Sequence, residues 1–249
     1  MSKILQGDCL ELLPSIPDKS IDLIFSDLPY KITQNQWDIP IDLPKLWEQY
    51  NRIIKDHGVI ALWAQAPFSH VLACSNLKMF RYEWVIEKTK ATGHLNAKKM
   101  PMKAHENILI FYKKLPVYHP QMSKGHTPVH SYVKHTTDGT CYGQTKTGIS
   151  GGGSTQRYPR DVLKFPWDTQ KNSLHATQKP VAVCEYIIKT YTNPGDVVLD
   201  STAGSMTTAI AAIQTGRKYI CMEKNREIFE TGKERIRSFL LENRKEGKL

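Results

Sequence analysis

The sequence predicts an α/β protein with a doubly wound, mostly parallel sheet. Short apolar runs of the length of buried strands alternate with segments of helical spacing through most of the 249 residues. Two of these runs end abruptly in polar residues, one at Asp27 and the other at Asp200. Ligands in an open α/β sheet bind just beyond the carboxyl ends of the strands. We therefore expect a ligand site where these two runs end.

The elements follow from apolar periodicity and from breakers. Strands are expected at 3–6, 21–26, 59–63, 82–87, 107–112, 197–199 and 218–222, and helices at 9–13, 43–56, 68–77, 180–192, 207–215 and 226–243. Pro14 and Pro17 end the first helix, and His57-Gly58 is expected to end the second. Strands 82–87 and 107–112 are expected to pair, joined by a basic loop over 88–103.

The stretch from 113 to 172 differs from the rest of the chain. Regular periodicity fades there, while prolines, glycines, histidines and lysines are frequent, and Gly151-Gly152-Gly153-Ser154 is a flexible run. A structureless loop of this length is uncommon inside a compact domain. We expect one domain over 1–249 that carries an insert over 113–172 for contact with a partner.

Composition bounds the cellular setting and the partners. The formal net charge is +10, which favours a polyanionic partner and nucleic acid first. The five cysteines are scattered, with no C-x-x-C pair, which argues for a reducing compartment and against a disulfide framework or a zinc site. No signal peptide or membrane-length apolar run is present. We expect a cytoplasmic protein with no membrane partner and no metal.

Asp27-Leu28-Pro29-Tyr30 is the first candidate site. Pro29 fixes its own φ and restrains Leu28 toward an extended conformation, which makes a stiff corner. A carboxylate and backbone carbonyls there suit the amino hydrogens of a flat ring, on which Tyr30 would stack. The alternative is a strand followed by an ordinary polar turn.

The second candidate site is the loop from Asp200 to Ser205, between a strand and a helix. Gly204 lets the backbone approach a ligand, and the helix N-terminus offers free N–H groups. Glu223 follows Asp200 at about the ~20-residue offset at which an acid meets ribose hydroxyls. The loop lacks the G-x-G-x-x-G pattern and any basic residue, so S-adenosylmethionine fits better than a dinucleotide. The alternative is a plain packing junction.

Together these residues resemble the amino-group DNA methyltransferases that use S-adenosylmethionine. That family carries an Asp/Asn/Ser-Pro-Pro-Tyr catalytic motif and a cofactor loop of the Asp-Pro-Phe-x-Gly-Ser-Gly-Thr type. Here the motifs are Asp27 to Tyr30 and Asp200 to Thr207, in the order of the subgroup called β. The flanks 31–38, 96–101 and 175–180 resemble that subgroup too. Leu28, Thr202 and Met206 depart from the family pattern.

The resemblance implies a seven-stranded sheet with one antiparallel strand at an edge. It implies catalytic roles for Asp27, Pro29 and Tyr30. It implies cofactor contacts for Asp8, Cys9, Asp27, Thr177, Lys179, Asp200, Thr202, Ala203, Gly204, Ser205 and Glu223. It implies substrate contacts for Leu28, Tyr30, Trp37, Lys98 and Lys99, and it makes 113–172 the target-recognition segment.

In this family Asp at the first motif position accompanies adenine, and Ser accompanies cytosine. Ser26 lies one position early, and no Pro-Cys pair for carbon-5 methylation exists. We therefore expect adenine-N6 methylation of DNA, with the base swung out of the duplex. The alternatives are cytosine-N4 methylation, an RNA or protein-amide methyltransferase, a dinucleotide-dependent oxidoreductase, and an inactive DNA-binding homologue. The sequence leaves open a cognate restriction endonuclease and a monomer or homodimer.

Overall fold

The computed structural model describes residues 2–29, 41–133, 150–166 and 178–245. These residues fall into two compact units. The main unit comprises Met1–His119 and Asp161–Leu249, and the small unit comprises Pro120–Arg160. In the part of the chain that is described, no helix is long and apolar enough to cross a membrane.

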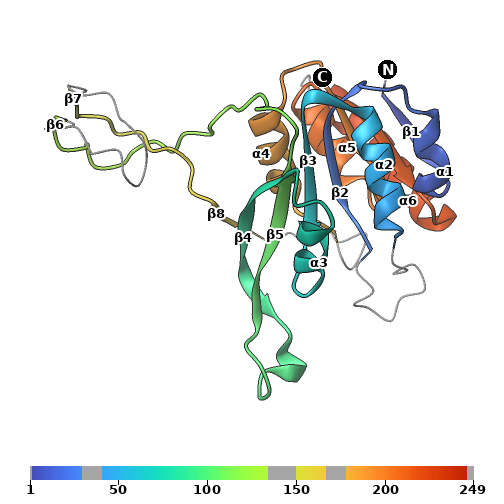
Figure 1. The fold of residues 1–249 in the computed structure, drawn as a ribbon, viewed down its shortest axis with the longest axis horizontal. Coiled ribbons are helices and arrows are strands. Elements are labelled where there is room, and N and C mark those ends of the chain that lie inside the picture. The colour runs from blue at the N-terminus through green and yellow to red at the C-terminus, as the bar shows by residue number, and fades with distance from the viewer. Residues whose placement is uncertain (1, 30–40, 134–149, 167–177, 246–249) are drawn as a thin grey trace. The chain divides into compact units, whose positions relative to one another are not determined.

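The main unit is built on one eight-stranded sheet in the order β1-β10-β9-β2-β3-β5-β4-β8 (Figure 1). Its strands are β1 (Lys3–Gln6), β2 (Ile21–Asp27), β3 (Ile54–Ala64), β4 (Phe80–Thr92), β5 (Lys103–Phe111), β8 (Val162–Phe165), β9 (Val197–Asp200) and β10 (Lys218–Glu223). Every strand runs in one direction except β5, which is antiparallel to β3 and to β4. The expected doubly wound, mostly parallel class is thus confirmed.

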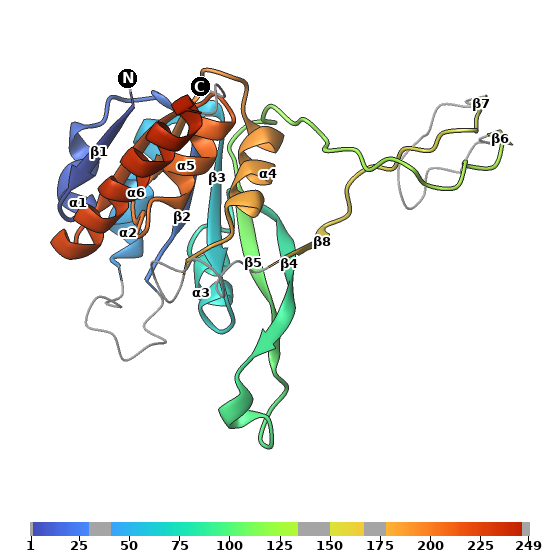
Figure 2. The same cartoon turned by 180° about the vertical axis from the view of Figure 1, so that it is seen from behind.

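Helices cover both faces of the sheet (Figure 2). They are α1 (Cys9–Leu12), α2 (Leu43–Ile53), α3 (Phe68–Ser75), α4 (Val181–Tyr191), α5 (Thr207–Gln214) and α6 (Arg226–Lys245), with short 3-10 turns η1 (Leu13–Ser15) and η2 (His94–Asn96). In β2, Ile24 joins the core under α1, α2 and α3, whereas Leu23 and Phe25 join the core under α4 and α5. A strand that is buried on both faces has consecutive apolar residues, as β2 has at Leu23, Ile24 and Phe25.

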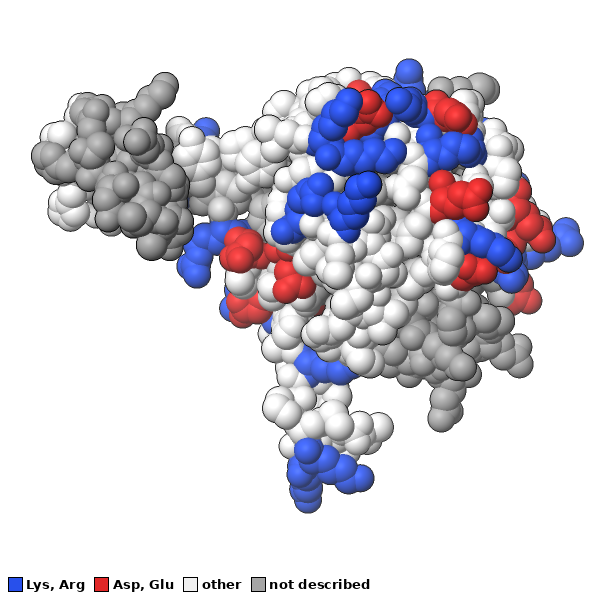
Figure 3. All heavy atoms as spheres, in the orientation of Figure 1, with Lys and Arg blue, Asp and Glu red and all other residues white. Residues whose placement is uncertain are grey.

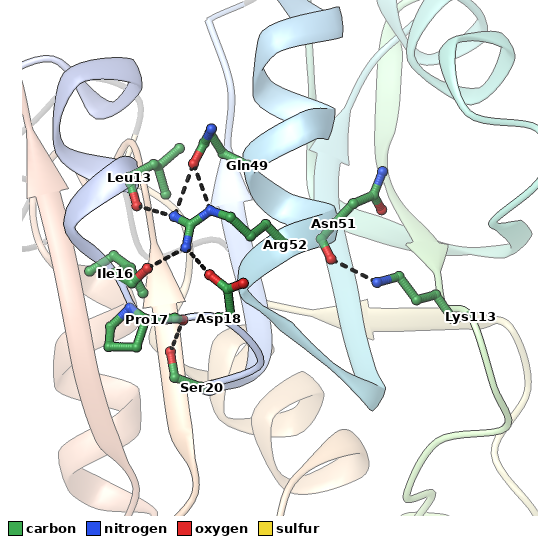
Figure 4. Close-up of polar contacts among 9 residues, drawn as sticks. All are labelled: Leu13, Ile16, Pro17, Asp18, Ser20, Gln49, Asn51, Arg52 and Lys113. Atoms are coloured by element: carbon green, nitrogen blue, oxygen red, sulfur yellow. Dashed lines mark hydrogen bonds and ion pairs between the residues drawn. The ribbon is translucent and has the colours of Figure 1, made fainter.

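A partly buried arginine ties the N-terminal turn to α2 (Figure 4). Arg52 donates hydrogen bonds to the carbonyls of Leu13 (2.9 Å) and Ile16 (2.7 Å), and it pairs with Asp18. The carbonyls that end η1 are thereby satisfied, and the chain is fixed where it enters β2.

The sheet differs from the expected one in its strand count. It has eight strands because Val162–Phe165, inside the stretch expected as an insert, pairs in parallel with β4. The single antiparallel strand, β5, lies between β3 and β4 and not at an edge.

The helix expected at 43–56 ends earlier, at Ile53, because Ile54 already pairs with Ile21 of β2. His57-Gly58 therefore does not end a helix but lies within β3. A Cβ on Gly58 would lie 2.8 Å from the carbonyl oxygen of Asp22, so only glycine fits this close approach to β2.

The pair expected at 82–87 and 107–112 is confirmed, but both strands run further into the expected loop. The ladder continues to Thr92 opposite Lys103. The residues from Lys88 to Lys103, here called the β4–β5 arm, project beyond the neighbouring strands (Figure 1).

The small unit is held mainly by backbone hydrogen bonds. Two short strands, β6 (Tyr132–Val133) and β7 (Ser150–Gly151), form an antiparallel pair. Ser123 and Arg157 exchange two backbone hydrogen bonds, of 3.0 and 2.9 Å. Tyr132 and Tyr158 are exposed, which leaves two aromatic rings of this unit open to a partner.

Candidate active site

The carboxyl ends of four adjacent parallel strands bring the two predicted motifs together. Strand order places β1, β10, β9 and β2 side by side, and Gln6 of β1 pairs with Glu223 of β10. Asp200 ends β9, and Asp27 ends β2. The expectation that one ligand site forms where these strands end is consistent with this register.

Asp27 lies at the corner that the sequence singled out. Its side chain is partly exposed, and Lys179 pairs with it at 2.9 Å. Leu28, which stands where the family has its first proline, is buried in the core, and Pro29 is half-buried. Burial of Leu28 therefore anchors the corner by packing in place of a proline ring.

Asp200 is buried and surrounded by uncharged donors. The Thr208 hydroxyl donates to its Oδ2 at 2.6 Å, and the backbone N–H of Thr202 donates to its Oδ1 at 3.2 Å. Burial raises the pKa of Asp200 to about 7, although these hydrogen bonds act in the opposite direction. This carboxyl group therefore holds its proton to a higher pH than an exposed aspartate does.

A cluster of hydroxyls lies beneath the cofactor-loop candidate. Ser201 donates its backbone N–H to the Ser26 hydroxyl at 3.0 Å, and its own hydroxyl lies 2.6 Å from that of Tyr50. All three residues are buried, and Tyr50 reaches the site from α2. Burial raises the pKa of Tyr50 well above its ordinary value, so the phenol stays neutral.

Thr202 joins the two motifs. Its hydroxyl donates to the backbone carbonyl of Asp27 at 3.0 Å. A phenylalanine, usual at this position in the resembled family, has no hydroxyl to make this bond. The departure at 202 therefore adds a polar link between the loop after β9 and the corner after β2.

Met206 is accommodated by a glycine on α6. It caps α5 in the left-handed conformation, at φ 61°. Its side chain is buried against α6, and a Cβ on Gly232 would lie 2.5 Å from the Met206 Cγ. The Met206 side chain therefore points into the core between α5 and α6.

Glu223 fixes two loops through both of its carboxylate oxygens. Oε2 accepts the backbone N–H of Gly204 at 2.9 Å, and Oε1 accepts that of Asn225 at 2.8 Å. Gly204 itself has φ +49°, and a Cβ there would meet no atom within 4 Å. The loop backbone at Gly204 thus faces open space, while Glu223 holds it from behind.

Asp8 and Cys9 follow β1 on the same edge. Asp8 caps α1 by accepting from the Leu10 N–H at 2.9 Å, and it pairs with Lys224 at 2.9 Å. Burial alone would raise the pKa of Asp8, but the Lys224 ammonium and the cap lower it. Burial raises the pKa of the Cys9 thiol to about 12, so Cys9 is a neutral group.

The structure adds two site residues that the sequence analysis did not select. Glu106 of β5 pairs with Lys179 at 3.0 Å and with Lys88 of β4 at 2.7 Å. The signal was available: Lys88 continues the inward phase of Trp84 and Ile86, and Glu106 precedes Ile108 and Ile110 in the same way. Two opposite charges in the buried phase of paired strands indicate an ion pair.

The remaining predicted site residues fall into two groups. Ala203 and Ser205 are buried in the loop after β9, while Lys98 and Lys99 are exposed in the β4–β5 arm. Figure 3 shows basic side chains gathered at the end of this arm. Tyr30, Trp37 and Thr177 lie outside the described residues. Among the described residues, no group of three histidine, cysteine or acidic side chains could hold a metal ion.

An α/β sheet of this strand order, with acidic residues at the ends of adjacent parallel strands, is a Rossmann-like fold with a ligand site at that edge. The family model described as DNA methylase, for N6 and N4 methyltransferases, matches residues 21–234. The chain therefore belongs to this family of S-adenosylmethionine-dependent DNA amino-methyltransferases, and the predicted family is confirmed.

Among curated relatives, the DNA adenine methyltransferase YhdJ of Escherichia coli strain K12 is 30% identical, over 94% of this chain and 82% of its own length. Type II methyltransferase M.HinfI of Haemophilus influenzae is 25% identical, over 95% of this chain and 68% of its own.

Two solved structures share the fold. The complex of M1.HpyAVI with SAM has a TM-score of 0.63 and 22% identity, over 94% of this chain and 100% of that one. PvuII DNA methyltransferase, described as cytosine-N4-specific, has a TM-score of 0.66 and 17% identity, over 92% of this chain and 84% of that one.

Proposed function

We propose that this protein transfers a methyl group from S-adenosylmethionine to the exocyclic N6 of adenine in DNA. The observation that carries the proposal is the placement of Asp27. Asp27 is the last residue of β2, and the loop after β9 lies next to it. The Thr202 hydroxyl in that loop donates to the backbone carbonyl of Asp27 at 3.0 Å. An acid in the first motif position favours adenine, and a relative named as a DNA adenine methyltransferase supports this choice.

The residues around the loop after β9 fit the cofactor. The carboxyl group of Asp200 suits an ammonium group, and that of Glu223 suits hydroxyls. The backbone at Gly204 faces open space, so a ligand can approach it closely. We assign the methionine amino group to Asp200, the ribose to Glu223, and the adenine end to Asp8 and Cys9. The other members of the cofactor site are Thr177, Lys179, Thr202, Ala203, Ser205 and Asp27.

Bound S-adenosylmethionine supplies an electrophilic methyl group. The chain's own part is to hold the target amino nitrogen in line with it. The Asp27 carboxylate and the Leu28 or Pro29 carbonyl accept the two amino hydrogens, which frees the nitrogen lone pair from conjugation with the ring. Tyr30 stacks on the flipped base, with Trp37 beside it. As the nitrogen forms its bond to the methyl carbon, the bond from that carbon to sulfur would break and leave a neutral thioether. The proton that the nitrogen loses would pass to solvent.

DNA contacts are assigned to two exposed regions. Lys98 and Lys99 in the β4–β5 arm offer charges to phosphates. The segment 113–172, which includes the small unit, is the proposed target-recognition insert, with exposed Tyr132 and Tyr158 for base contact. The proposed setting is a cytoplasmic enzyme of restriction–modification type, with a cognate endonuclease as its partner.

The test is transfer of labelled methyl from S-adenosylmethionine to unmethylated genomic DNA, followed by nucleoside analysis, for the wild type and Asp27→Ala. We expect N6-methyladenine with the wild type and none with the variant. The fold shared with a structure described as cytosine-N4-specific makes that base the second candidate. N4-methylcytosine in the same digest would replace adenine by cytosine as the target. Labelled RNA in place of DNA would favour an RNA substrate.

A further inference from the structure

Four ionisable side chains form a continuous chain from the interior to the catalytic corner. Lys88 Nζ lies 2.7 Å from one Glu106 oxygen, and Lys179 Nζ lies 3.0 Å from the other. Lys179 also lies 2.9 Å from Asp27. We call this set, Lys88–Glu106–Lys179–Asp27, the charge chain; β4, β5, the segment before α4, and β2 each contribute one member.

Exposure increases along the charge chain. The side chains of Lys88 and Glu106 are 6% and 8% exposed, that of Lys179 is 14% exposed, and that of Asp27 is 30% exposed. A buried charge is tolerated only with close partners. The buried Lys88–Glu106 pair therefore anchors Lys179, and Lys179 in turn contacts Asp27 at the catalytic corner.

Aromatic rings fix the position of the Lys179 ammonium from another side. Its Nζ lies 5.1 Å from the centre of the Trp63 ring, and Trp63 stacks on Phe25 with centroids 6.0 Å apart. Both rings belong to the buried core. Lys179 is thus held by two carboxylates and one ring face, which leaves its ammonium little freedom to move.

The charges balance within the chain. Methylation of a neutral amino nitrogen builds positive charge next to Asp27, and the cofactor brings a sulfonium. An ammonium beside Asp27 would oppose both unless a second carboxylate offsets it. Glu106 supplies that carboxylate next to Lys179, and Lys88, on the other oxygen of Glu106, brings the sum of the four charges to zero.

We propose that Glu106, supported by Lys88, is a positioning residue for methyl transfer. It holds Lys179 and balances its charge, so that Lys179 orients the Asp27 carboxylate without cancelling its effect on the amino group. This role rests on the proposed function, because Asp27 is its point of action. Glu106 itself touches neither substrate nor cofactor.

The test is steady-state methylation by Glu106→Gln, which keeps the shape of the side chain and removes its charge. We expect kcat to fall about 10- to 100-fold, with KM for S-adenosylmethionine and for DNA within about threefold of the wild type. The control is Glu87→Gln on the same hairpin, which removes the exposed Lys164–Glu87 pair. That control should retain kcat within about twofold.

The pH profile gives a readout that a purely structural role would not move. Among described residues, the titratable groups around Lys179 are Asp27, Glu106 and Cys184, with Lys88 behind Glu106 and Asp200 beyond Asp27. Burial lowers the pKa of Lys179, but the carboxylates of Asp27 and Glu106 raise it above its ordinary value. Removing the Glu106 charge should therefore lower the pKa of Lys179, so kcat should fall at a lower pH on the alkaline side than it does in the wild type.

A double variant keeps the test decisive if Glu106→Gln folds poorly. Lys88→Met with Glu106→Gln also removes the buried ammonium that would lose its Glu106 partner, so part of the free energy of unfolding should be recovered. Lys179 still lacks its second carboxylate, so kcat should stay low. A double variant that regains both stability and kcat would overturn the positioning role, as would wild-type kcat in Glu106→Gln. A wild type without transferase activity would overturn the proposed function and this role together.

Discussion

On the β4 and β5 side of the site, charged side chains form a chain of ion pairs, whereas on the β9 side uncharged hydroxyls surround one carboxyl group. Asp27 meets an ammonium at 2.9 Å, and Asp200 meets the Thr208 hydroxyl at 2.6 Å. The two acids end neighbouring parallel strands, yet their partners differ in kind. The comparison shows that one edge of a sheet can hold two acids in different environments. Asp27 lies next to a cation, whereas burial raises the pKa of Asp200.

The energetics of the two sides differ accordingly. Lys179 and Lys88 together lower the pKa of Glu106 against the opposing effect of burial. In the part of the chain that is described, no cation pairs with Asp200, and burial raises its pKa to about 7. The free energy of unfolding should therefore fall when any one charge of the charge chain is removed. On the β9 side, it should depend on pH.

The largest expected effect is on activity at the exposed end of the charge chain. Asp27→Asn keeps the shape of the side chain but removes the charge next to the target amino group. We expect kcat to fall about 10²- to 10³-fold, the usual loss for a group aimed at developing charge. Lys179 retains Glu106, so the free energy of unfolding from urea titration should change by less than in Lys179→Met. Near-wild-type kcat in Asp27→Asn would mean that the backbone carbonyls alone hold the amino group.

The second prediction concerns stability in the middle of the charge chain. Lys179→Met leaves the buried Glu106 with Lys88 alone and leaves Asp27 without this partner. Breaking a buried pair from one side costs about 3 kcal/mol, which urea unfolding should detect. Lys189→Met is the matched control, because it breaks the exposed Lys189–Glu185 pair and should cost less than about 0.5 kcal/mol. Equal losses in both variants would show that the chain behaves as a surface network.

The third prediction tests the hydroxyl side by pH. The native pKa of Asp200, about 7, is raised above the ordinary 3.8. Between these values the native state holds a proton that the unfolded state has lost, so stability falls as pH rises through this window. Asp200→Asn removes the effect and keeps acceptor and donor groups for Thr202 and Thr208. From pH 5 to pH 8 the wild type should lose about 2 kcal/mol relative to the variant in urea unfolding. Parallel curves would show that Asp200 is ionised throughout.

The fourth prediction concerns the hydroxyl beneath the loop. Tyr50→Phe removes one buried hydroxyl and leaves the Ser201 hydroxyl with one partner fewer, at 3.4 Å from Ser26. The loss should be about 1 kcal/mol in the free energy of unfolding, typical of a neutral hydrogen bond, and it should not depend on pH. A loss of several kcal/mol would place this side in the same energetic class as the charge chain.

The sequence predicted the strands, which follow from apolar runs, and the acidic residues at which two of them end. Asp27 and Asp200 end mostly apolar runs, so both strands and the edge that they share could be predicted from the sequence. The surroundings of these acids come from far along the chain. Lys179, which pairs with Asp27, is itself held by Glu106 of β5, and Ser201, next to Asp200, is hydrogen-bonded to Tyr50 of α2. Such meetings depend on strand order, and the interior place of the antiparallel β5, which brings Glu106 to the site, has no signal in local periodicity. The end of α2 at Ile53 was missed for a related reason, because pairing of Ile54 with Ile21 overrides helical spacing.

The bond that joins the two sides gives the smallest and most specific prediction. Thr202→Val keeps the shape of the side chain and removes the hydroxyl that donates to the Asp27 carbonyl, whereas Thr202→Ser keeps the hydroxyl. Thr202 is half-buried, so the cost in stability should be below about 1 kcal/mol. If the link positions Asp27, kcat in the valine variant should fall about 3- to 10-fold, and serine should restore it. If serine and valine reduce kcat equally, the methyl group of Thr202 matters and not the bond, and the two sides of the site would act independently.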